Sequence, residues 1–286
     1  MKISRRSTMK KNKKNKKKQI ISVVLISAVA VIFIIPLVYM ISTSLKPKEE
    51  VLRDTAALLG SYLDFSNYAR AWNAFPFGRY LFNSIFVGLV TTALTLVTSA
   101  MAAYAFARLR FRGRDKLFFA YLATLMVPLQ VTIIPLYMIL RLLGWNDTYA
   151  ALAIPPAFTA FGVFMLRQFF LSIPMEIEEA ARIDGCGRFR IFTVIILPMS
   201  KPGLGALAIF TFVNSWKSFF WPLIVTASDE MKTLPLGLYT FSGQYGTDWT
   251  ALMAATGISI IPGVIFYIIF QKSLVQGIAL SGMGGR

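Results

Sequence analysis

The 286-residue sequence contains no histidine and a single cysteine, Cys186. Without histidine, the chain lacks the usual acid–base group near neutral pH and the commonest metal ligand. It has no G-x-x-x-x-G-K-[ST] phosphate-binding loop either, and Gly185-Cys186-Gly187 is only an isolated G-x-G. These absences exclude histidine-based acid–base chemistry and the commonest kind of metal site, and they predict a chain that binds no nucleotide.

Acidic residues are also scarce: 13 Asp and Glu stand against 30 Lys and Arg, a net charge of +17. Charged residues make up 15% of the chain and hydrophobic residues 56%, whereas a soluble domain carries about 25% charged residues. Ten of the basic residues precede Gln19, directly before a long apolar run. This placement favours an anchor to anionic lipid headgroups over a nucleic-acid site. We therefore expect membrane lipid as a partner and no nucleic acid.

Six apolar segments are long enough to cross about 30 Å of hydrocarbon as helices. The first has the basic front of a signal peptide, but its apolar run is too long and no small-residue cleavage site follows. The sequence thus predicts an all-α, polytopic membrane protein with six transmembrane helices. The predicted spans are residues 20–40, 80–105, 117–140, 149–170, 204–225 and 252–270.

Basic residues lie unequally on the two sides of these spans. Twenty-two are on the side of both termini, seven are on the opposite side, and Lys217 falls inside the fifth predicted span. The positive-inside rule therefore predicts that both termini are cytoplasmic. The predicted regions are a basic cytoplasmic tail (1–19), a first transmembrane helix with an external loop (20–79), a core of five transmembrane helices (80–275) with a cytoplasmic loop at 172–202, and a cytoplasmic C-terminal tail (276–286).

The second predicted span carries small residues four positions apart, namely Gly88 with Thr92 and Ser99 with Ala103. This spacing lets helix backbones approach closely in lipid. We therefore expect the second span to approach other helices closely.

The 172–202 loop predicts two short helices. The first should begin with Ser172 as N-cap and Pro174 in its first turn, and end at Gly185. One face should hold Ile177, Ala180, Ala181 and Asp184. That face predicts either an amphipathic helix lying on lipid or a narrow ridge that enters a groove of another protein.

The second helix should start near Gly187 and stop at Pro198 and Pro202. Its apolar residues, which we expect to lie on the membrane-embedded core, are Phe189, Phe192, Ile195 and Ile196.

Residues 179–198 combine Glu-Ala-Ala, a glycine at 185 and Ile-Ile-Leu-Pro ending at 198. This spaced pattern resembles the cytoplasmic loop of permease subunits from binding-protein-dependent ABC importers. From the second span onward the chain is similar to the second permease subunit of carbohydrate importers, like the smaller maltose-type subunit. Further stretches that carry the resemblance are Asn83-Ser84, Ala103-Tyr104-Ala105-Phe106-Ala107-Arg108, Pro128-Leu129-Gln130, Ile134-Pro135-Leu136-Tyr137, Phe164-Met165-Leu166-Arg167-Gln168-Phe169-Phe170, Trp221-Pro222-Leu223-Ile224 and Gln244-Tyr245-Gly246-Thr247-Asp248-Trp249.

The resemblance implies a type I ABC importer permease fold in a bacterial cytoplasmic (inner) membrane. It also implies a pore shared with a second, related permease, two cytoplasmic ATP-binding subunits that hydrolyse ATP, an extracytoplasmic solute-binding protein and a sugar substrate. Because the partner subunits hydrolyse ATP, we expect this chain not to be an enzyme and to hold no cofactor or metal. The residues that would couple this chain to the ATPases are Glu179, Ala180, Ala181, Asp184, Gly185, Leu197 and Pro198.

Polar or aromatic residues within the spans are candidates for the solute path, namely Gln130, Asn214, Trp216 and Lys217. The alternative for the first three is ordinary hydrogen bonding between helices. Lys217 departs from the family pattern, and a charge inside a span faces a cavity or a partner. It would contact an acidic solute, pair with a carboxylate of the partner permease, or extend outward.

Two other functions stay open at this level. The same machinery would serve a glycerol-phosphate-like or other small polar solute. A non-transport membrane scaffold or receptor would use the 172–202 loop to bind a regulator.

Overall fold

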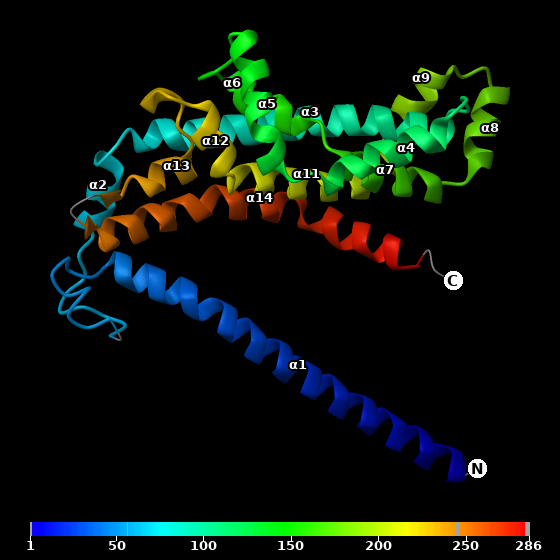
Figure 1. The fold of residues 1–286 in the computed structure, drawn as a ribbon. Helices are drawn as coiled ribbons and strands as arrows, with labels where there is room; N and C mark the ends of the chain where they lie inside the picture. The colour runs from blue at the N-terminus through cyan, green and yellow to red at the C-terminus, as the bar shows by residue number, and fades with distance from the viewer. Residues whose placement is uncertain (1, 56, 244–245, 284–286) are drawn as a thin grey trace. The chain divides into compact units, whose positions relative to one another are not determined.

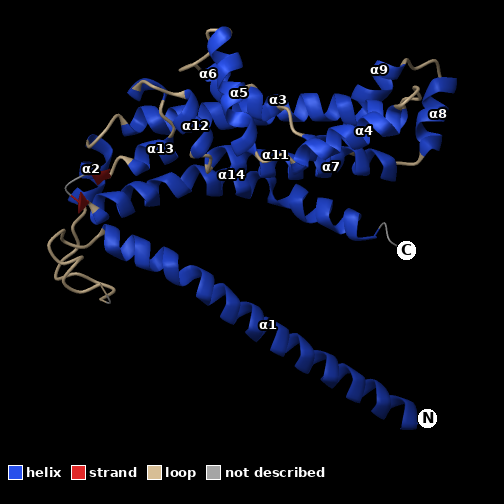
Figure 2. Cartoon of the chain, in the orientation of Figure 1, coloured by secondary structure: helices blue, strands red, loops and turns tan. Residues whose placement is uncertain are grey.

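The computed structural model describes residues 2–55, 57–243 and 246–283, and most of them are helical (Figures 1 and 2). The all-α prediction is confirmed, apart from a pair of two-residue strands, β1 (Ser242–Gly243) and β2 (Gly246–Thr247). The α-helices are α1 (Lys2–Ser44), α2 (Ser66–Asn73), α3 (Phe77–Arg108), α4 (Arg114–Ala123), α5 (Leu129–Leu142), α6 (Tyr149–Ala153), α7 (Ala160–Ser172), α8 (Met175–Ile183), α9 (Arg188–Arg190), α10 (Leu197–Met199), α11 (Lys201–Trp216), α12 (Phe220–Val225), α13 (Leu234–Tyr239) and α14 (Trp249–Met283). Single turns of other types are the 3₁₀ segments η1 (Thr124–Met126), η2 (Pro155–Ala157) and η4 (Asp229–Met231) and the π-helix η3 (Ile191–Ile196).

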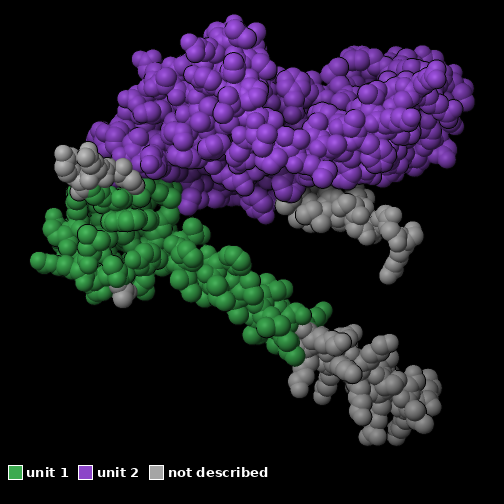
Figure 3. All heavy atoms as spheres, viewed as in Figure 1, with its two compact units in different colours: residues 1–71, 244–257 green, residues 72–243, 258–286 purple. Residues whose placement is uncertain are grey.

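The chain forms two compact units, which Figure 3 distinguishes by colour. Unit 1 holds residues 1–71 and 244–257, and unit 2 holds residues 72–243 and 258–286. The predicted tails at 1–19 and 276–286 continue α1 and α14 as helix, while Met1 and residues 284–286 lie outside the described residues. So do Gln244 and Tyr245, which belong to one of the stretches that carry the family resemblance.

Unit 1 is held together where α1 ends. The Asn67 amide donates to the carbonyls of Ser44 and Lys46, at 2.9 Å each. Lys48 Nζ lies 2.9 Å from Asp248 Oδ2, so residues far apart in the sequence meet in this unit.

Three described helical segments are long and apolar enough to cross a membrane alone: Gln19–Ser44, Phe77–Arg108 and Trp249–Lys272. Three bent pairs of helices bring the total to as many as six. The six candidates agree in number with the six predicted transmembrane helices, and three of them are bent at a break in the helix.

The third predicted span, 117–140, bends by 101° between Met126 and Leu129. Val127 adopts an extended conformation (φ −85°, ψ 114°) directly before Pro128. A proline disfavours the helical conformation of the residue before it, and this local rule outweighs the apolar run.

The fifth predicted span, 204–225, is also divided. Helix α11 ends at Trp216, and Lys217 follows as its C-cap instead of lying inside a span. A new helix, α12, starts at Phe220 and carries Pro222 in its first turn, where the missing N–H costs no helical hydrogen bond.

Helix α3 is the packing centre of unit 2, and its small residues allow the close approach that the sequence predicts. Gly88, Thr92, Ser99 and Ala103 are all buried, and α3 makes its most extensive contacts with α7 and α11. A Cβ atom at Gly88 would lie 2.9 Å from the ring of Phe212 on α11. The bundle therefore depends on close backbone approach, as expected for helices packed in lipid.

Candidate functional site

Helix α8 begins later than the sequence predicts. Ser172 is the last residue of α7, and its hydroxyl donates to the Phe169 carbonyl at 2.7 Å, so its assignment as N-cap is wrong. Ile173 is extended before Pro174, and Pro174 itself stands at the cap of α8. The proline again decides where the helix starts.

The C-terminus of α8 is the one predicted. Gly185 has φ +81°, a left-handed conformation that favours glycine. The Cys186 amide donates to the Ala181 carbonyl at 2.9 Å, and the Gly185 amide donates to the Arg182 carbonyl at 3.0 Å. These two bonds are a Schellman motif, which satisfies carbonyls that the helix end leaves free.

The face of α8 that is exposed differs from the predicted face by about one residue. Ala181 is buried and Ile177 is partly buried, so both belong to the inner face. The outer, exposed face is formed by Glu176, Glu179, Ala180 and Ile183, at helical spacings of three, one and three residues. We call these four residues the outer face of α8; Ile183 is 87% exposed on it, and Asp184 is exposed just beyond it.

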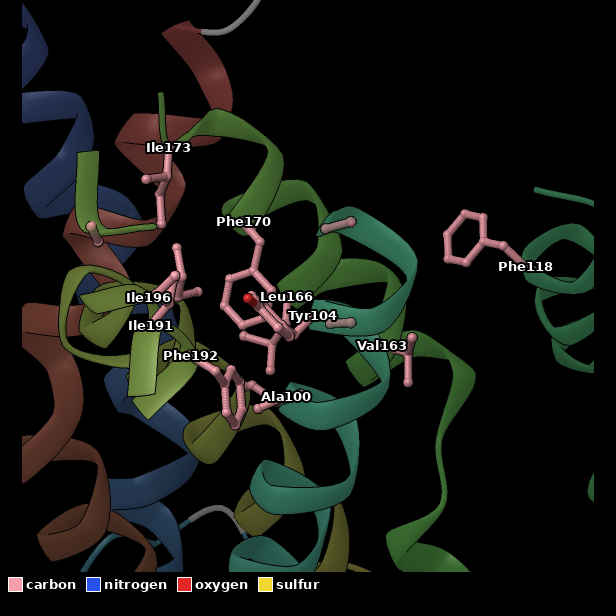
Figure 4. Packing of buried hydrophobic residues seen from close by; sticks show 14 residues of the cluster. Ala100, Tyr104, Phe118, Val163, Leu166, Phe170, Ile173, Ile191, Phe192 and Ile196 are labelled. Atoms are coloured by element: carbon pink, nitrogen blue, oxygen red, sulfur yellow. The ribbon is translucent and has the colours of Figure 1, made fainter. Parts of the chain in front are cut away.

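The inner face rests on a hydrophobic cluster that joins α3, α7 and η3 (Figure 4). Ala181 of α8 belongs to this cluster. Side chains that Figure 4 labels in it include Tyr104, Leu166, Phe170, Ile191, Phe192 and Ile196. The second helix of the loop therefore reaches the core as predicted, except that Phe189 is 77% exposed.

The helix after Gly187 does not break at Pro198. Its turns widen into the π-helix η3, and Pro198 then occupies the start of α10, where its missing N–H is tolerated. The chain turns by 76° between Met199 and Lys201. Leu197 is half-buried against the cluster, whereas Pro198 is exposed. π-helical turns are rare in proteins, and those that occur are often found at functional sites.

A buried ion pair beneath α8 is the feature that sequence reasoning missed. Arg108 Nε lies 2.7 Å from Glu178 Oε1, and the two side chains are 5% and 0% exposed. Arg182 Nη2 lies 3.8 Å from the other oxygen, Glu178 Oε2, and is 41% exposed. The signal available in the sequence was that Glu178 lies three residues before the apolar Ala181, the spacing of residues on one helix face.

A cavity of about 320 Å³ lies elsewhere in unit 2, among α3, α5, α6, α7, α11 and α12. Its walls carry apolar and aromatic groups, including Phe161, Phe210 and Trp221. None of the described residues that line it is ionisable. The polar lining consists of Ser84, Thr91, Thr159, Thr211, Asn214, Ser215, Ser218 and Thr233.

Only one of the four predicted solute-path residues lines this cavity, namely Asn214. Gln130 is exposed beside the lining residue Leu129. Trp216 stacks on Phe212, with ring centroids 5.7 Å apart. Lys217 is exposed at the end of α11.

Comparison with known proteins identifies relatives that cover most of the chain. The family described as "Binding-protein-dependent transport system inner membrane component" matches residues 95–280. The chain is 36% identical over 259 residues to the arabinooligosaccharides transport system permease protein AraQ of Halalkalibacterium halodurans, across 90% of this chain and 93% of that protein. It is 36% identical over 208 residues to the sn-glycerol-3-phosphate transport system permease protein UgpE of Yersinia enterocolitica, across 72% and 74%.

Among solved structures, a bacterial ABC transporter involved in the import of the acidic polysaccharide alginate has a chain similar to this one. The TM-score is 0.79 at 27% identity, across 89% of this chain and 95% of that chain. These relatives are transport proteins, not enzymes. The chain belongs to the family of binding-protein-dependent transport system inner membrane components, and it is a multi-pass membrane permease with the type I ABC importer fold.

Proposed function

We propose that this chain forms one half of the pore of an ATP-driven importer for neutral oligosaccharides in a bacterial cytoplasmic membrane. The observation that carries this proposal is the cavity in unit 2, which combines hydroxyl and amide groups with aromatic walls and has no ionisable side chain among its described lining residues. Sugars present hydroxyl groups at their edges and apolar C–H faces, and such a lining matches both. The arabinooligosaccharide permease among the relatives supports a solute of this class.

An anionic solute is the second candidate, because relatives named for glycerol 3-phosphate and alginate transport exist. Phosphate and carboxylate groups are bound by charge-assisted hydrogen bonds, mostly from Arg or Lys. Lys217 is the residue that favours this candidate, since it stands between the cavity residues Ser215 and Ser218. The cavity itself offers no cation from its described lining.

Uptake by the assembled transporter, with its binding protein, distinguishes the two solute classes. Radiolabelled arabinotriose and glycerol 3-phosphate serve as probes, and the variants are Lys217→Gln and, as control, Lys201→Gln, an exposed lysine at the other end of α11. We expect arabinotriose uptake that changes by no more than about twofold in either variant, as for an exposed charge outside the binding surface. A neutral solute would be contradicted if the wild-type transporter took up glycerol 3-phosphate, Lys217→Gln abolished that uptake and Lys201→Gln left it intact.

We also propose that the outer face of α8 docks onto one of two cytoplasmic ATP-binding subunits. An apolar side chain as exposed as Ile183 is suited to a groove in a partner protein. The alanine at 180 leaves room for close approach beside the two carboxylates of that face. ATP binding would close the pair of ATP-binding subunits, and this closure would move α8. The pore would have two states, and the movement of α8 would favour one of them.

The remaining predicted coupling residues shape this surface. Gly185 ends α8 with its left-handed turn, and Leu197 and Pro198 shape the return of the chain to the bundle. The apolar, exposed residues of α1 are available to lipid and to the second permease. An extracytoplasmic binding protein would deliver the solute to the opposite side of the membrane.

Co-purification tests the docking surface. Ala180→Arg is expected to remove the ATPase subunits from the purified assembly, because a long charged side chain would separate the two surfaces. Ser172→Arg adds the same side chain at an exposed position outside the outer face of α8 and should leave the assembly intact. ATPase subunits retained by Ala180→Arg would contradict the docking surface. A wild-type assembly that accumulates no solute would favour the scaffold alternative.

A further inference from the structure

We propose that Arg108 is a positioning residue that makes α8 move as one body with α3 and α7. Its buried contact with Glu178 would pass the displacement of α8 directly to the membrane helices. This inference rests on the proposed docking of α8 onto an ATPase. It adds the connection by which docking becomes motion of the pore.

One guanidinium group joins three elements. Arg108 is the last residue of α3, and its Nε lies 2.7 Å from the carboxylate of Glu178 on α8. Its Nη2 donates to the carbonyl of Phe170, near the end of α7, and to the carbonyl of Ile173, at 2.6 Å. Its Nη1 lies 3.3 Å from the sulfur of Met175, the first residue of α8.

The hydrogen bonds of Arg108 to the two carbonyls are directional, unlike the apolar packing around them. Ala181 and its apolar neighbours would keep most of their contact if α8 slid by a fraction of an ångström. The two carbonyls hold the guanidinium in place at the end of α7, so the same slide of α8 would lengthen and weaken the 2.7 Å ion pair between Arg108 Nε and Glu178 Oε1. The ion pair therefore opposes movement of α8 relative to α7, and the apolar cluster resists separation.

The burial of the pair indicates a role beyond holding the helix. Glu178 is completely buried and the Arg108 side chain is 5% exposed. Burying two charges carries a desolvation cost that well-packed apolar side chains of similar volume would avoid. Helix α8 is also short and is bounded by the extended Ile173 and the left-handed Gly185, two points where the chain can pivot. The ion pair in the middle of α8 restrains that pivot.

The test is the number of solute molecules accumulated per ATP hydrolysed by the assembled transporter in proteoliposomes, with arabinotriose as probe. Glu178→Gln keeps the shape of the side chain and removes its charge. We expect the ATPase subunits to stay bound and MgATP hydrolysis to continue, while accumulation per ATP falls on the order of tenfold. A merely structural role would lower assembly, hydrolysis and uptake together and leave the ratio unchanged.

Two further variants keep the result interpretable. Arg108→Lys retains one charge but loses the fork, and its ratio should fall as well. Arg182→Gln changes the exposed, more distant partner of Glu178 and should leave the ratio at the wild-type value. An unchanged ratio in Glu178→Gln, or an equal loss in Arg182→Gln, would overturn the proposal. So would failure of both Glu178→Gln and Arg108→Lys to assemble, because that outcome assigns the pair to folding.

Failure of this inference is separable from failure of the proposed function. A wild-type chain that retains no ATPase subunits, or that accumulates no arabinotriose, counts against the proposed function. If the wild-type transporter couples hydrolysis to uptake and the Glu178→Gln transporter couples them equally well, then the role of Arg108 is refuted and the proposed function is not.

Discussion

Helices α1 and α3 both contain an uninterrupted apolar segment long enough to span a membrane, yet their surroundings within the chain are opposite. The segment Gln19–Ser44 has a mean hydropathy of 3.0 in its most apolar window, and none of that window is buried. For Phe77–Arg108 the mean hydropathy is 1.9, and 39% of the window is buried. The more hydrophobic helix is thus the less packed one.

The difference teaches which residues hold a membrane bundle together. Lipid tails are as apolar as leucine, so hydrophobicity alone does not draw two helices together in a membrane. Helix α1 presents Val, Ile, Leu and Phe side chains that are exposed on every side. Helix α3 instead buries glycine, alanine, serine and threonine, which allow close contact with α7 and α11.

The largest effect should come from adding one side chain to each helix. In Gly88→Leu the new Cβ would already lie 2.9 Å from the buried Phe212 ring, which is itself stacked on Phe266 and Trp216. Overpacking of this kind lowers the free energy of unfolding by about 1–3 kcal/mol or more. The thermal unfolding midpoint of the purified chain in detergent measures it.

The matched control is Ala28→Leu in α1, where the residue is exposed. There the change should stay within about 0.5 kcal/mol, as for most exposed positions. Equal destabilisation by the two variants would break the comparison between the helices.

A smaller effect is expected from a polar contact of α3. The Asn83 amide donates to the carbonyls of Glu230 and Lys232 at 2.7 and 2.8 Å, and its oxygen accepts from the Tyr149 hydroxyl at 2.6 Å. Asn83→Leu removes the partner of these part-buried groups, at a cost of about 1–3 kcal/mol in the free energy of unfolding.

Asn214→Leu sharpens this test, because Asn214 is exposed to the cavity instead of being held by other helices. It should change stability by less than about 0.5 kcal/mol but lower arabinotriose uptake. If Asn214→Leu lowered the free energy of unfolding more than Asn83→Leu does, the hydrogen bonds of Asn83 on α3 would not be the ones that stabilise the bundle.

The smallest effect concerns a loop next to the packed region. Asp147 lies between α5 and α6, and its Oδ1 accepts from the amides of Ala227 and Ser228 at 2.9 and 3.1 Å. Burial raises the pKa of Asp147, but these hydrogen bonds outweigh it and hold the pKa below the usual 3.8. The stabilisation is therefore fully present above the pKa of the unfolded chain and is lost as the pH falls through the lower, folded pKa.

Asp147→Asn should lower the free energy of unfolding near pH 7 by no more than a few tenths of a kcal/mol, because the group is largely screened by solvent. The difference from wild type should shrink when the unfolding midpoint is measured at pH values below about 4. A difference that grows on acidification would show that the carboxylate does not act through its ionised form.

In the 172–202 loop, local sequence decides where α8 ends but not which face of α8 points inward. Gly185 ends α8 as predicted, because a left-handed cap depends only on the residue at that position. The predicted start of α8 was too early by a few residues, although the sequence contains Pro174, the residue that stands at the cap of the helix. The predicted face was wrong by about one residue, because which face turns inward depends on Arg108, a residue of another helix.

By itself, the sequence determined the helical class, the apolar segments, the small-residue stripe of α3 and the family pattern around Glu179. These features depend on composition and short spacings, which act along the chain. The tertiary structure decided where the spans bend, that Lys217 lies outside α11, that Asn214 lines a cavity, and which glutamate is buried. Each of these depends on packing between residues distant in the sequence, and packing energies depend on positions in space instead of order along the chain.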